Sequence, residues 1–241
     1  MHPYYKDKDG YISLYLGDCR EITEWLDADV LVTDPPYGRS WKQGGQPKGR
    51  GWADDSNSGI AGDESTAVRD AVLELWGDRP AILFGDLMLP PPKNTKQVLI
   101  YQKSRTSGTK GTFAGFRRDA EAIYIVGPWK AGLSGKSSIL VSAWDGNSAQ
   151  REYGHPHAKP EDIMRELIRA CPEGTIADPF AGSGTTLSAA RSLGRRSIGV
   201  EVDETYVGLL NSRLYWSMMT PGIFLDQSLQ GDLFSECEID L

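Results

Sequence analysis

The fold of this chain is decided by residues 30–37, which read Val-Leu-Val-Thr-Asp-Pro-Pro-Tyr. The apolar half has the length and the β-branched content of a buried strand. Two consecutive prolines cannot continue the hydrogen-bond ladder of a sheet, so the strand ends here. A carboxylate, two carbonyl groups and an aromatic ring are then presented at the C-terminal end of a strand, where ligands bind in open α/β sheets. An ordinary proline-rich turn would end a strand in the same way, so this stretch alone leaves both interpretations open.

Length and composition predict a globular protein built as one large domain, or as one domain with insertions. The chain has 241 residues, enough to bury a sizeable core. None of its apolar runs approaches the roughly 20 residues that a membrane span needs. The first residues lack the apolar core of a signal peptide, so we expect a cytoplasmic protein. His155 and His157 could face the same way, but two ligands without a nearby third predict no metal site.

Charge is segregated along the chain, although its net value is −7. Residues 37–53 and 87–118 carry basic charges only, whereas residues 217–241 carry acidic charges only. Tryptophans lie among the cations of the first basic stretch, an arrangement that suits stacking on bases and contact with phosphates. A basic face for nucleic acid is therefore predicted, with solvated surface loops as the alternative. The cations that we expect to contact DNA are Arg39, Lys42, Lys48, Arg50, Lys103 and Arg105.

Periodicity and breakers predict alternating strands and helices along most of the chain. The expected strands are residues 12–16, 30–34, 80–84, 97–102, 120–126, 138–143, 174–177 and 197–200. The expected helices are residues 20–26, 63–76, 160–170, 204–216 and the segment from 184 to about 193.

A second functional stretch is residues 178–184, Asp-Pro-Phe-Ala-Gly-Ser-Gly, which lies between an expected strand and an expected helix. Glycines in such a turn let backbone amides approach a ligand closely. Glu201 follows the next expected strand, and an acid about 20 residues after a Gly-rich turn can bind ribose hydroxyls. The glycine pattern is not Gly-x-Gly-x-x-Gly, so a nicotinamide dinucleotide is not the favoured ligand.

Taken together, these motifs resemble those of the beta-class DNA amino-methyltransferases. Asp-Pro-Pro-Tyr at 34–37 comes first and the Gly-rich turn at 178–184 comes later, as in that class. Residues 155–160, His-Pro-His-Ala-Lys-Pro, are similar to its His-Pro-x-x-Lys-Pro segment, and Gly17-Asp18 is similar to its early Gly-Asp element. The resemblance covers residues 10–216, and four matches in the right order make chance a poor explanation.

The resemblance implies an α/β fold with a doubly wound, mostly parallel, Rossmann-like methyltransferase sheet whose chain order is permuted. Residues 1–216 would form the methyltransferase domain and residues 217–241 an acidic C-terminal tail. Residues 37–62 would be a mobile loop that contacts DNA, and residues 130–154 a short target-recognition insert. Because that insert is small, we expect reading of the DNA sequence to be relaxed, to be shared with residues 38–62, or to be supplied by a second subunit.

The resemblance also implies the cofactor, S-adenosylmethionine. Asp18 would lie near its adenine, Glu201 would hold its ribose hydroxyls, and Lys159 would approach its carboxylate or brace the neighbouring loop. The full set implied to bind the cofactor is Asp18, Asp34, Lys159, Asp178, Phe180, Ala181, Gly182, Ser183, Gly184 and Glu201.

The catalytic residues implied are Asp34, Pro35, Pro36 and Tyr37. The Asp34 carboxylate and the Pro35 carbonyl would accept hydrogen bonds from an exocyclic amine and localise its lone pair for attack on a methyl group. Tyr37 would stack on a base flipped out of double-stranded DNA. Aspartate at position 34 favours adenine N6 as the target, with cytosine N4 as the near alternative. An RNA or protein substrate, or a module that binds the cofactor and nucleic acid without turnover, belongs to other classes of function.

Overall fold

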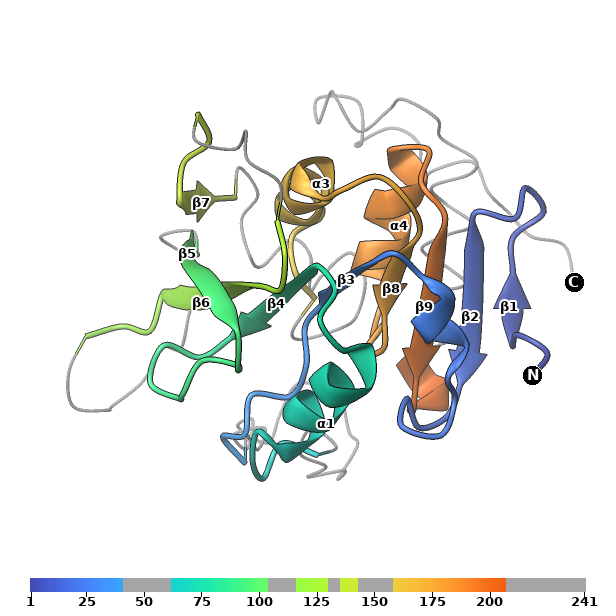
Figure 1. Cartoon of the computed structure of the whole chain (residues 1–241), viewed down its shortest axis with the longest axis horizontal. Coiled ribbons are helices and arrows are strands. Elements are labelled where there is room, and N and C mark those ends of the chain that lie inside the picture. The colour runs from blue at the N-terminus through green and yellow to red at the C-terminus, as the bar shows by residue number, and fades with distance from the viewer. Residues whose placement is uncertain (41–61, 104–115, 130–134, 143–157, 207–241) are drawn as a thin grey trace, which may run out of the picture.

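The structure of this chain is a computed structural model that describes residues 1–40, 62–103, 116–129, 135–142 and 158–206. These residues form a nine-stranded sheet in the order β1-β2-β9-β8-β3-β4-β6-β5-β7 (Figure 1). The strands are β1 (Tyr5–Lys6), β2 (Ile12–Leu16), β3 (Val30–Thr33), β4 (Ala81–Gly85), β5 (Thr95–Gln102), β6 (Ala120–Val126), β7 (Ile139–Val141), β8 (Ile176–Asp178) and β9 (Ser197–Glu201). The helices are η1 (Glu24–Asp27), α1 (Ala67–Trp76), α3 (Glu161–Ala170) and α4 (Thr185–Ser192).

The centre of the sheet is parallel and its chain order is permuted. Strands β2, β9, β8, β3 and β4 pair in parallel with one another, whereas β1 runs antiparallel to β2, and β6 runs antiparallel between β4 and β5. The last two strands of the sequence, β8 and β9, therefore lie between β2 and β3. The predicted fold class, an α/β sheet that is mostly parallel and permuted, is confirmed.

Strand β3 is buried on both faces, which explains its continuous apolar sequence. Val30 and Val32 pack in one core cluster with residues of α3 and α4, whereas Leu31 packs in another with α1 and η1. Figure 1 shows α3 and α4 on one side of the sheet and α1 on the other. Because the central strands of this covered sheet are parallel, their C-terminal ends and the residues that follow them lie at one common edge.

The face that carries α1 contains a stacked tryptophan pair. The rings of Trp25 and Trp76 lie 5.9 Å apart, and the Arg79 guanidinium lies 3.5 Å from the centroid of the Trp76 ring. The Trp25 indole N–H donates to the Cys19 carbonyl, which an α-helix over residues 20–26 would need for its own ladder. The prediction of that helix is wrong, and only the short 3-10 helix η1 forms.

The start of α1 is also later than predicted. The helix begins at Ala67 rather than at residue 63, because the Asp63 carbonyl, which a helix from that residue would use, accepts the backbone N–H of Ser40. Strand β1 was not predicted, and the other described elements lie within a few residues of their predicted bounds. The predicted helix over 204–216 falls mostly outside the described residues, as does the whole of the predicted tail. Among the helices that the structure describes, none has the length and the apolar character needed to cross a bilayer.

Candidate active site

Four carboxylates follow the ends of central strands at the C-terminal edge of the sheet. Asp34 follows β3, Asp178 ends β8, Glu201 ends β9 and Asp18 lies two residues after β2. Because these strands are parallel neighbours, four segments far apart in the sequence meet at one edge. All four residues were predicted site residues, and the topology brings their segments together.

Asp34 is held by two side chains. The Tyr37 hydroxyl donates to Asp34 Oδ1 over 2.7 Å, and the Lys159 ammonium lies 3.0 Å from Asp34 Oδ2. Burial raises the pKa of the Asp34 carboxyl above its usual value, the Lys159 charge opposes that rise, and the charge of Glu121 adds to it. Pro35, the next residue in the sequence, is buried, so the core holds its backbone in place.

Lys159 precedes α3 and is buried between two carboxylates. Its ammonium lies 3.0 Å from Asp34 and 3.1 Å from Glu121 Oε2, and it also faces the rings of Tyr37 and Phe84 at 5.2 and 5.1 Å. Burial alone would lower the pKa of Lys159, but the two carboxylates raise it above its usual value. Lys159 is therefore charged. The sequence assigned it to the cofactor carboxylate or to loop bracing, and in this structure its partners are both protein carboxylates.

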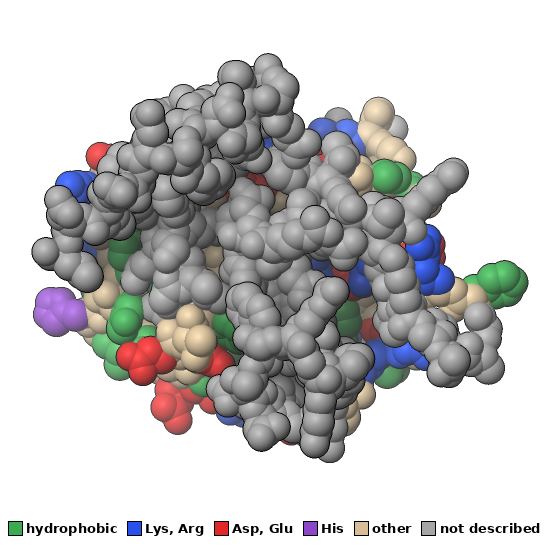
Figure 2. All heavy atoms as spheres, turned by 180° about the vertical axis from the view of Figure 1, so that it is seen from behind, with side chains coloured by type: hydrophobic (Ala, Val, Ile, Leu, Met, Phe, Trp, Pro, Cys, Tyr) green, Lys and Arg blue, Asp and Glu red, His purple; other side chains and the backbone are tan. Residues whose placement is uncertain are grey.

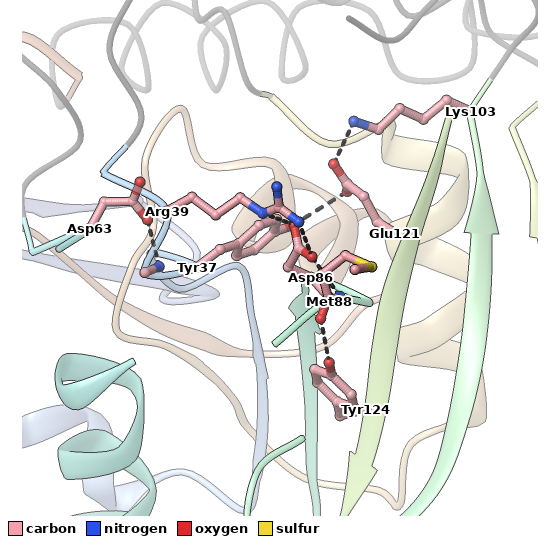
Figure 3. A network of polar contacts seen from close by, with 9 residues as sticks. Tyr37, Arg39, Asp63, Asp86, Met88, Lys103, Glu121 and Tyr124 are labelled. Atoms are coloured by element: carbon pink, nitrogen blue, oxygen red, sulfur yellow. Dashed lines mark hydrogen bonds and ion pairs between the residues drawn. The ribbon is translucent and has the colours of Figure 1, made fainter. Parts of the chain in front are cut away.

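Glu121 is a site residue that the sequence analysis missed. Burial works to raise its pKa, but Lys159 and Lys103 together lower the pKa of Glu121 to about 2 (Figure 3). Because β6 is antiparallel to β4, the start of β6 lies at the edge where the parallel strands end. A search for acids after strands cannot find such a residue. The signal present in the sequence was a charged residue at the second position of an otherwise apolar strand.

The Gly-rich turn is tied to the end of β9. Gly182 has φ +50° and Gly184 has φ +76°, both in the left-handed region that favours glycine, and α4 begins directly after Gly184. The Gly182 N–H donates to Glu201 Oε2 over 2.7 Å, and the Asp203 N–H donates to Oε1 over 2.8 Å. Burial raises the pKa of Glu201. The other predicted residues of the turn are the half-buried Phe180 and the buried Ala181 and Ser183.

Asp178 is a buried carboxyl whose hydrogen-bond donors are neutral. Its Oδ1 accepts the Thr33 hydroxyl at 2.6 Å and the Phe180 N–H at 3.1 Å, and Thr186 contributes a further hydrogen bond. Burial raises the pKa of Asp178 to about 6, although these hydrogen bonds oppose the rise. Ionised Asp178 is therefore costly in the protein without a bound cation.

Replacing Asp178 with asparagine should increase the free energy of unfolding at pH 8. A pKa raised in the folded state means that this carboxyl favours folding below its unfolded value and loses that contribution as the pH rises to about 6. The neutral amide avoids the loss, so we expect a gain of about 1–3 kcal/mol, to be measured by urea unfolding. The matched control is Asp7→Asn, which should destabilise the protein because the equally buried Asp7 pairs with Arg191 at 3.0 Å. A loss of stability in Asp178→Asn at pH 8 would contradict the prediction.

Asp18 lies at the same edge with a local partner. Its carboxylate forms an ion pair with the guanidinium of Arg20 and accepts the Arg20 backbone N–H at 2.8 Å. These hydrogen bonds lower the pKa of Asp18. The pair fixes the turn after β2, so the carboxylate stays near the end of β9, which is paired in parallel with β2.

The two described cations that were predicted to contact DNA are both paired with carboxylates. Arg39 binds Asp86 after β4, and Lys103 binds Glu121, as Figure 3 shows. Neither acid lies in the basic stretch of sequence that contains its partner, so composition along the chain overlooked both pairs. A phosphate would have to compete with these carboxylates. Lys42, Lys48, Arg50 and Arg105 lie outside the described residues.

Figure 2 shows most of the visible Lys and Arg side chains on the right of that view and most of the Asp and Glu side chains at the lower left. Opposite charges are therefore separated on the described part of this face. Such a separation is compatible with a basic face for nucleic acid, which stays a prediction.

The segment that follows Tyr37 is anchored at both ends of the predicted 37–62 loop. Gly38 has φ +84°, and a Cβ at this position would lie 2.6 Å from the backbone of Ser65, so only glycine fits. Its N–H donates to Asp63 Oδ1 over 2.7 Å. Both ends of the loop therefore lie next to the Asp-Pro-Pro-Tyr motif. Residues 41–61 lie outside the described residues.

Within the ranges that the structure describes, no three His, Cys, Asp or Glu side chains gather as a metal site would require. His155 and His157 are outside these ranges. The site is thus a set of carboxylates, one buried ammonium and a Gly-rich turn.

This arrangement agrees with the comparison against known protein families. The family model N6_N4_Mtase, described as DNA methylase, matches residues 85–212, which is more than half of the chain. The chain therefore belongs to this family of DNA amino-methyltransferases, the class that its sequence motifs predicted. The Asp-Pro-Pro-Tyr motif precedes the matched segment.

Individual relatives are similar to this chain over stretches of different length. YubD of Escherichia coli (strain K12) is 30% identical over 209 residues, which cover 79% of this chain and 84% of that protein. The type II methyltransferase M.ScaI of Streptomyces caespitosus is 41% identical over 69 residues, or 28% of this chain and 23% of its own length.

Among solved structures, the complex of M1.HpyAVI with its ligand SAM has a TM-score of 0.59 at 19% identity, covering 84% of this chain and 98% of that one. The PvuII DNA methyltransferase, which is cytosine-N4-specific, also has a TM-score of 0.59, at 16% identity, covering 95% of this chain and 90% of that one. At these identities the two structures support the fold.

Proposed function

We propose that this protein transfers a methyl group from S-adenosylmethionine to the exocyclic N6 of adenine in double-stranded DNA. The observation that carries the proposal is the position of Asp34. Its carboxylate lies 3.0 Å from a buried ammonium, directly follows β3, and belongs to the same sheet edge as the Gly-rich turn. A hydrogen-bond acceptor for the target amine and a cofactor cradle thus share one edge.

The residues of the second cluster fit this cofactor. S-adenosylmethionine supplies an electrophilic methyl group on a sulfonium, together with a ribose diol and an ammonium group. Each Glu201 oxygen accepts one backbone N–H, and a carboxylate has about four acceptor positions, so acceptor capacity is left for a diol. Asp178, which has only neutral donors, would become easier to ionise next to a cationic ligand. Asp18 and Phe180 would contact the cofactor from the neighbouring strand ends.

In the proposed mechanism, the target adenine leaves the duplex, at a cost of a few kcal/mol, and its amine meets Asp34 and the Pro35 carbonyl. An amine conjugated to the ring is a poor nucleophile, and two acceptors on its N–H groups would localise the nitrogen lone pair for in-line attack on the methyl carbon. As the C–N bond forms, the bond between that carbon and the sulfonium sulfur would break with its electron pair left on sulfur, and the methylated amine would lose one proton to water. Pro35 suits this task because its φ is fixed and it is buried. Tyr37 would contact the base through its ring.

Cytosine N4 is the second candidate, because the same two acceptors would serve its amine and one neighbour in fold is cytosine-N4-specific. For DNA contact, the 37–62 loop, which is anchored next to Tyr37, and the 130–154 insert remain the proposed elements. Arg39 and Lys103 could reach phosphates only by exchanging their carboxylate partners. A homodimer that supplies further DNA contacts is also a proposal.

The first test is the identity of the methylated nucleoside. The purified protein is incubated with S-adenosylmethionine and unmethylated genomic DNA, the DNA is digested, and the nucleosides are identified by mass spectrometry. We expect N6-methyladenine. N4-methylcytosine would overturn the adenine assignment and keep the mechanism, whereas absence of both products with cofactor binding intact would favour an RNA substrate, a missing partner or a module without turnover.

A further inference from the structure

Four charged side chains of alternating sign form a continuous row from the catalytic motif to the edge of β5. Asp34 contacts Lys159, Lys159 contacts Glu121, and Glu121 contacts Lys103. The side chains of Lys159 and Glu121 are only 9% and 13% exposed, whereas those of Asp34 and Lys103 are 24% and 26% exposed. The inner two charges thus have little access to water and depend on each other.

The position of the Lys159 ammonium is set by both carboxylates. An ammonium has three N–H donors, and Asp34 and Glu121 lie 3.0 and 3.1 Å from it, nearly equidistant. The rings of Tyr37 and Phe84 occupy further directions around it. The Tyr37 hydroxyl, which donates to Asp34, also lies 3.4 Å from Glu121 Oε2. Glu121 therefore touches both of the groups that hold Asp34.

We infer that Glu121 is a positioning residue for the catalytic carboxylate, because it shares Lys159 with Asp34 and so keeps Asp34 oriented without tying it to a one-to-one ion pair. The inference rests on the proposed function, in which Asp34 accepts the target amine. If the buried ammonium paired with Asp34 alone, the Asp34 carboxylate would be a weaker hydrogen-bond acceptor for that amine. Sharing the ammonium with Glu121 leaves Asp34 more basic.

The titration of Asp34 reports this sharing. The charged and titratable groups that face Asp34 are Lys159 before α3, Glu121 on β6, Tyr37 in the same loop and Asp178 on β8. Glu121 in turn faces Lys103 and Tyr101 from β5. Of the carboxylates around Asp34, Glu121 shares its ammonium, so removing the charge of Glu121 acts on Asp34 in two ways that lower its pKa: the direct repulsion is lost, and Lys159 is left to Asp34 alone.

The experiment is a titration of the Asp34 side-chain carboxyl by ¹³C NMR in the full chain labelled at aspartate, without substrate or cofactor. The Asp34 resonance is assigned by its loss in Asp34→Asn. In Glu121→Gln, which keeps the volume and removes the charge, we expect the Asp34 midpoint to move down by about one pH unit. In Lys159→Gln it should move up. An Asp34 midpoint that stays unchanged or rises in Glu121→Gln would overturn the inference.

One further variant serves as a control, and another replaces Glu121→Gln if that variant does not fold. Asp9→Asn is the control, because the exposed Asp9 pairs with Arg191 at 3.0 Å, a cation outside the row of four charges. It should leave the Asp34 midpoint unchanged, and an equal shift there would overturn the inference. If Glu121→Gln does not fold, Lys103→Gln replaces it, since Lys103 is partly exposed. Without Lys103, Glu121 should draw Lys159 from Asp34 and raise the Asp34 midpoint, and no change would count against the inference.

A kinetic readout links the titration to chemistry. In single-turnover methyl transfer, Glu121→Gln should lower the maximal rate about tenfold and shift the acid limb of the pH profile downward, with half-saturating S-adenosylmethionine unchanged. A change in half-saturation alone would contradict a positioning role. Absence of methyl transfer by the unaltered protein would count against the proposed function, whereas the NMR titration would still decide the inference.

Discussion

Replacing Asp34 with alanine should reduce methyl transfer by about 10³-fold while binding of S-adenosylmethionine persists. In the proposed mechanism this carboxylate accepts hydrogen bonds from the target amine, and it is the side chain of the Asp-Pro-Pro-Tyr motif that pairs with Lys159. The variant should still fold, because Lys159 keeps Glu121 as its partner. Single-turnover rates measure the transfer and isothermal titration calorimetry measures cofactor binding.

The control for this prediction is Asp9→Ala, which removes an exposed carboxylate that pairs with Arg191 far from the strand ends. Its methyl-transfer rate should equal that of the unaltered protein. If Asp34→Ala abolishes cofactor binding, Asp34 is a cofactor-binding residue in the first place, and the acceptor role has to be assigned elsewhere.

Replacing Lys159 with methionine should lower the free energy of unfolding by about 3–5 kcal/mol at pH 8, because it removes the common partner of two buried carboxylates. Asp34 and Glu121 would then repel each other, and one of them would have its folded-state pKa raised. A raised folded-state pKa gives stability at low pH that is lost as the pH rises. The destabilisation should therefore be smaller at pH 5 than at pH 8, which urea unfolding at the two pH values measures.

The double variant Lys159→Met with Glu121→Gln should recover part of this loss at pH 8, because a single carboxylate then remains. Arg165→Met is the control for loss of a cation on the neighbouring helix α3, where Arg165 pairs with Glu161 at 3.7 Å. Its cost should be about 0.3–0.5 kcal/mol. An equal loss of stability in Lys159→Met at both pH values would contradict the assignment of two repelling carboxylates.

Local signals in the sequence predicted where strands of this protein end. Two prolines stop β3 after Thr33, and the glycines of residues 178–184 require the left-handed turn from which α4 starts. Both signals depend only on neighbouring residues, because they come from fixed or permissive φ angles. Together with Glu201, they predicted the sheet edge and, through the family resemblance, the permuted order of the strands.

Local signals failed where a side chain had a tertiary partner. The helix expected over 20–26 does not form, since the indole of Trp25, stacked on Trp76, takes the Cys19 carbonyl. The helix expected from residue 63 starts at Ala67, since the Asp63 carbonyl accepts the Ser40 N–H. In both cases a hydrogen bond outside the local helix competed with the helix ladder.

The ion-pair partners of the charged side chains follow from the tertiary structure alone. Lys159, predicted to approach the cofactor, lies between Asp34 and Glu121, and the predicted DNA contacts Arg39 and Lys103 lie on carboxylates from other strands. Glu121 reaches the site because β6 runs antiparallel beside β4, a direction that no residue of β6 encodes locally. Ion pairs form between segments that the topology places side by side, so the sequence predicted which acids follow the strand ends, whereas the fold specified the electrostatic surroundings of Asp34.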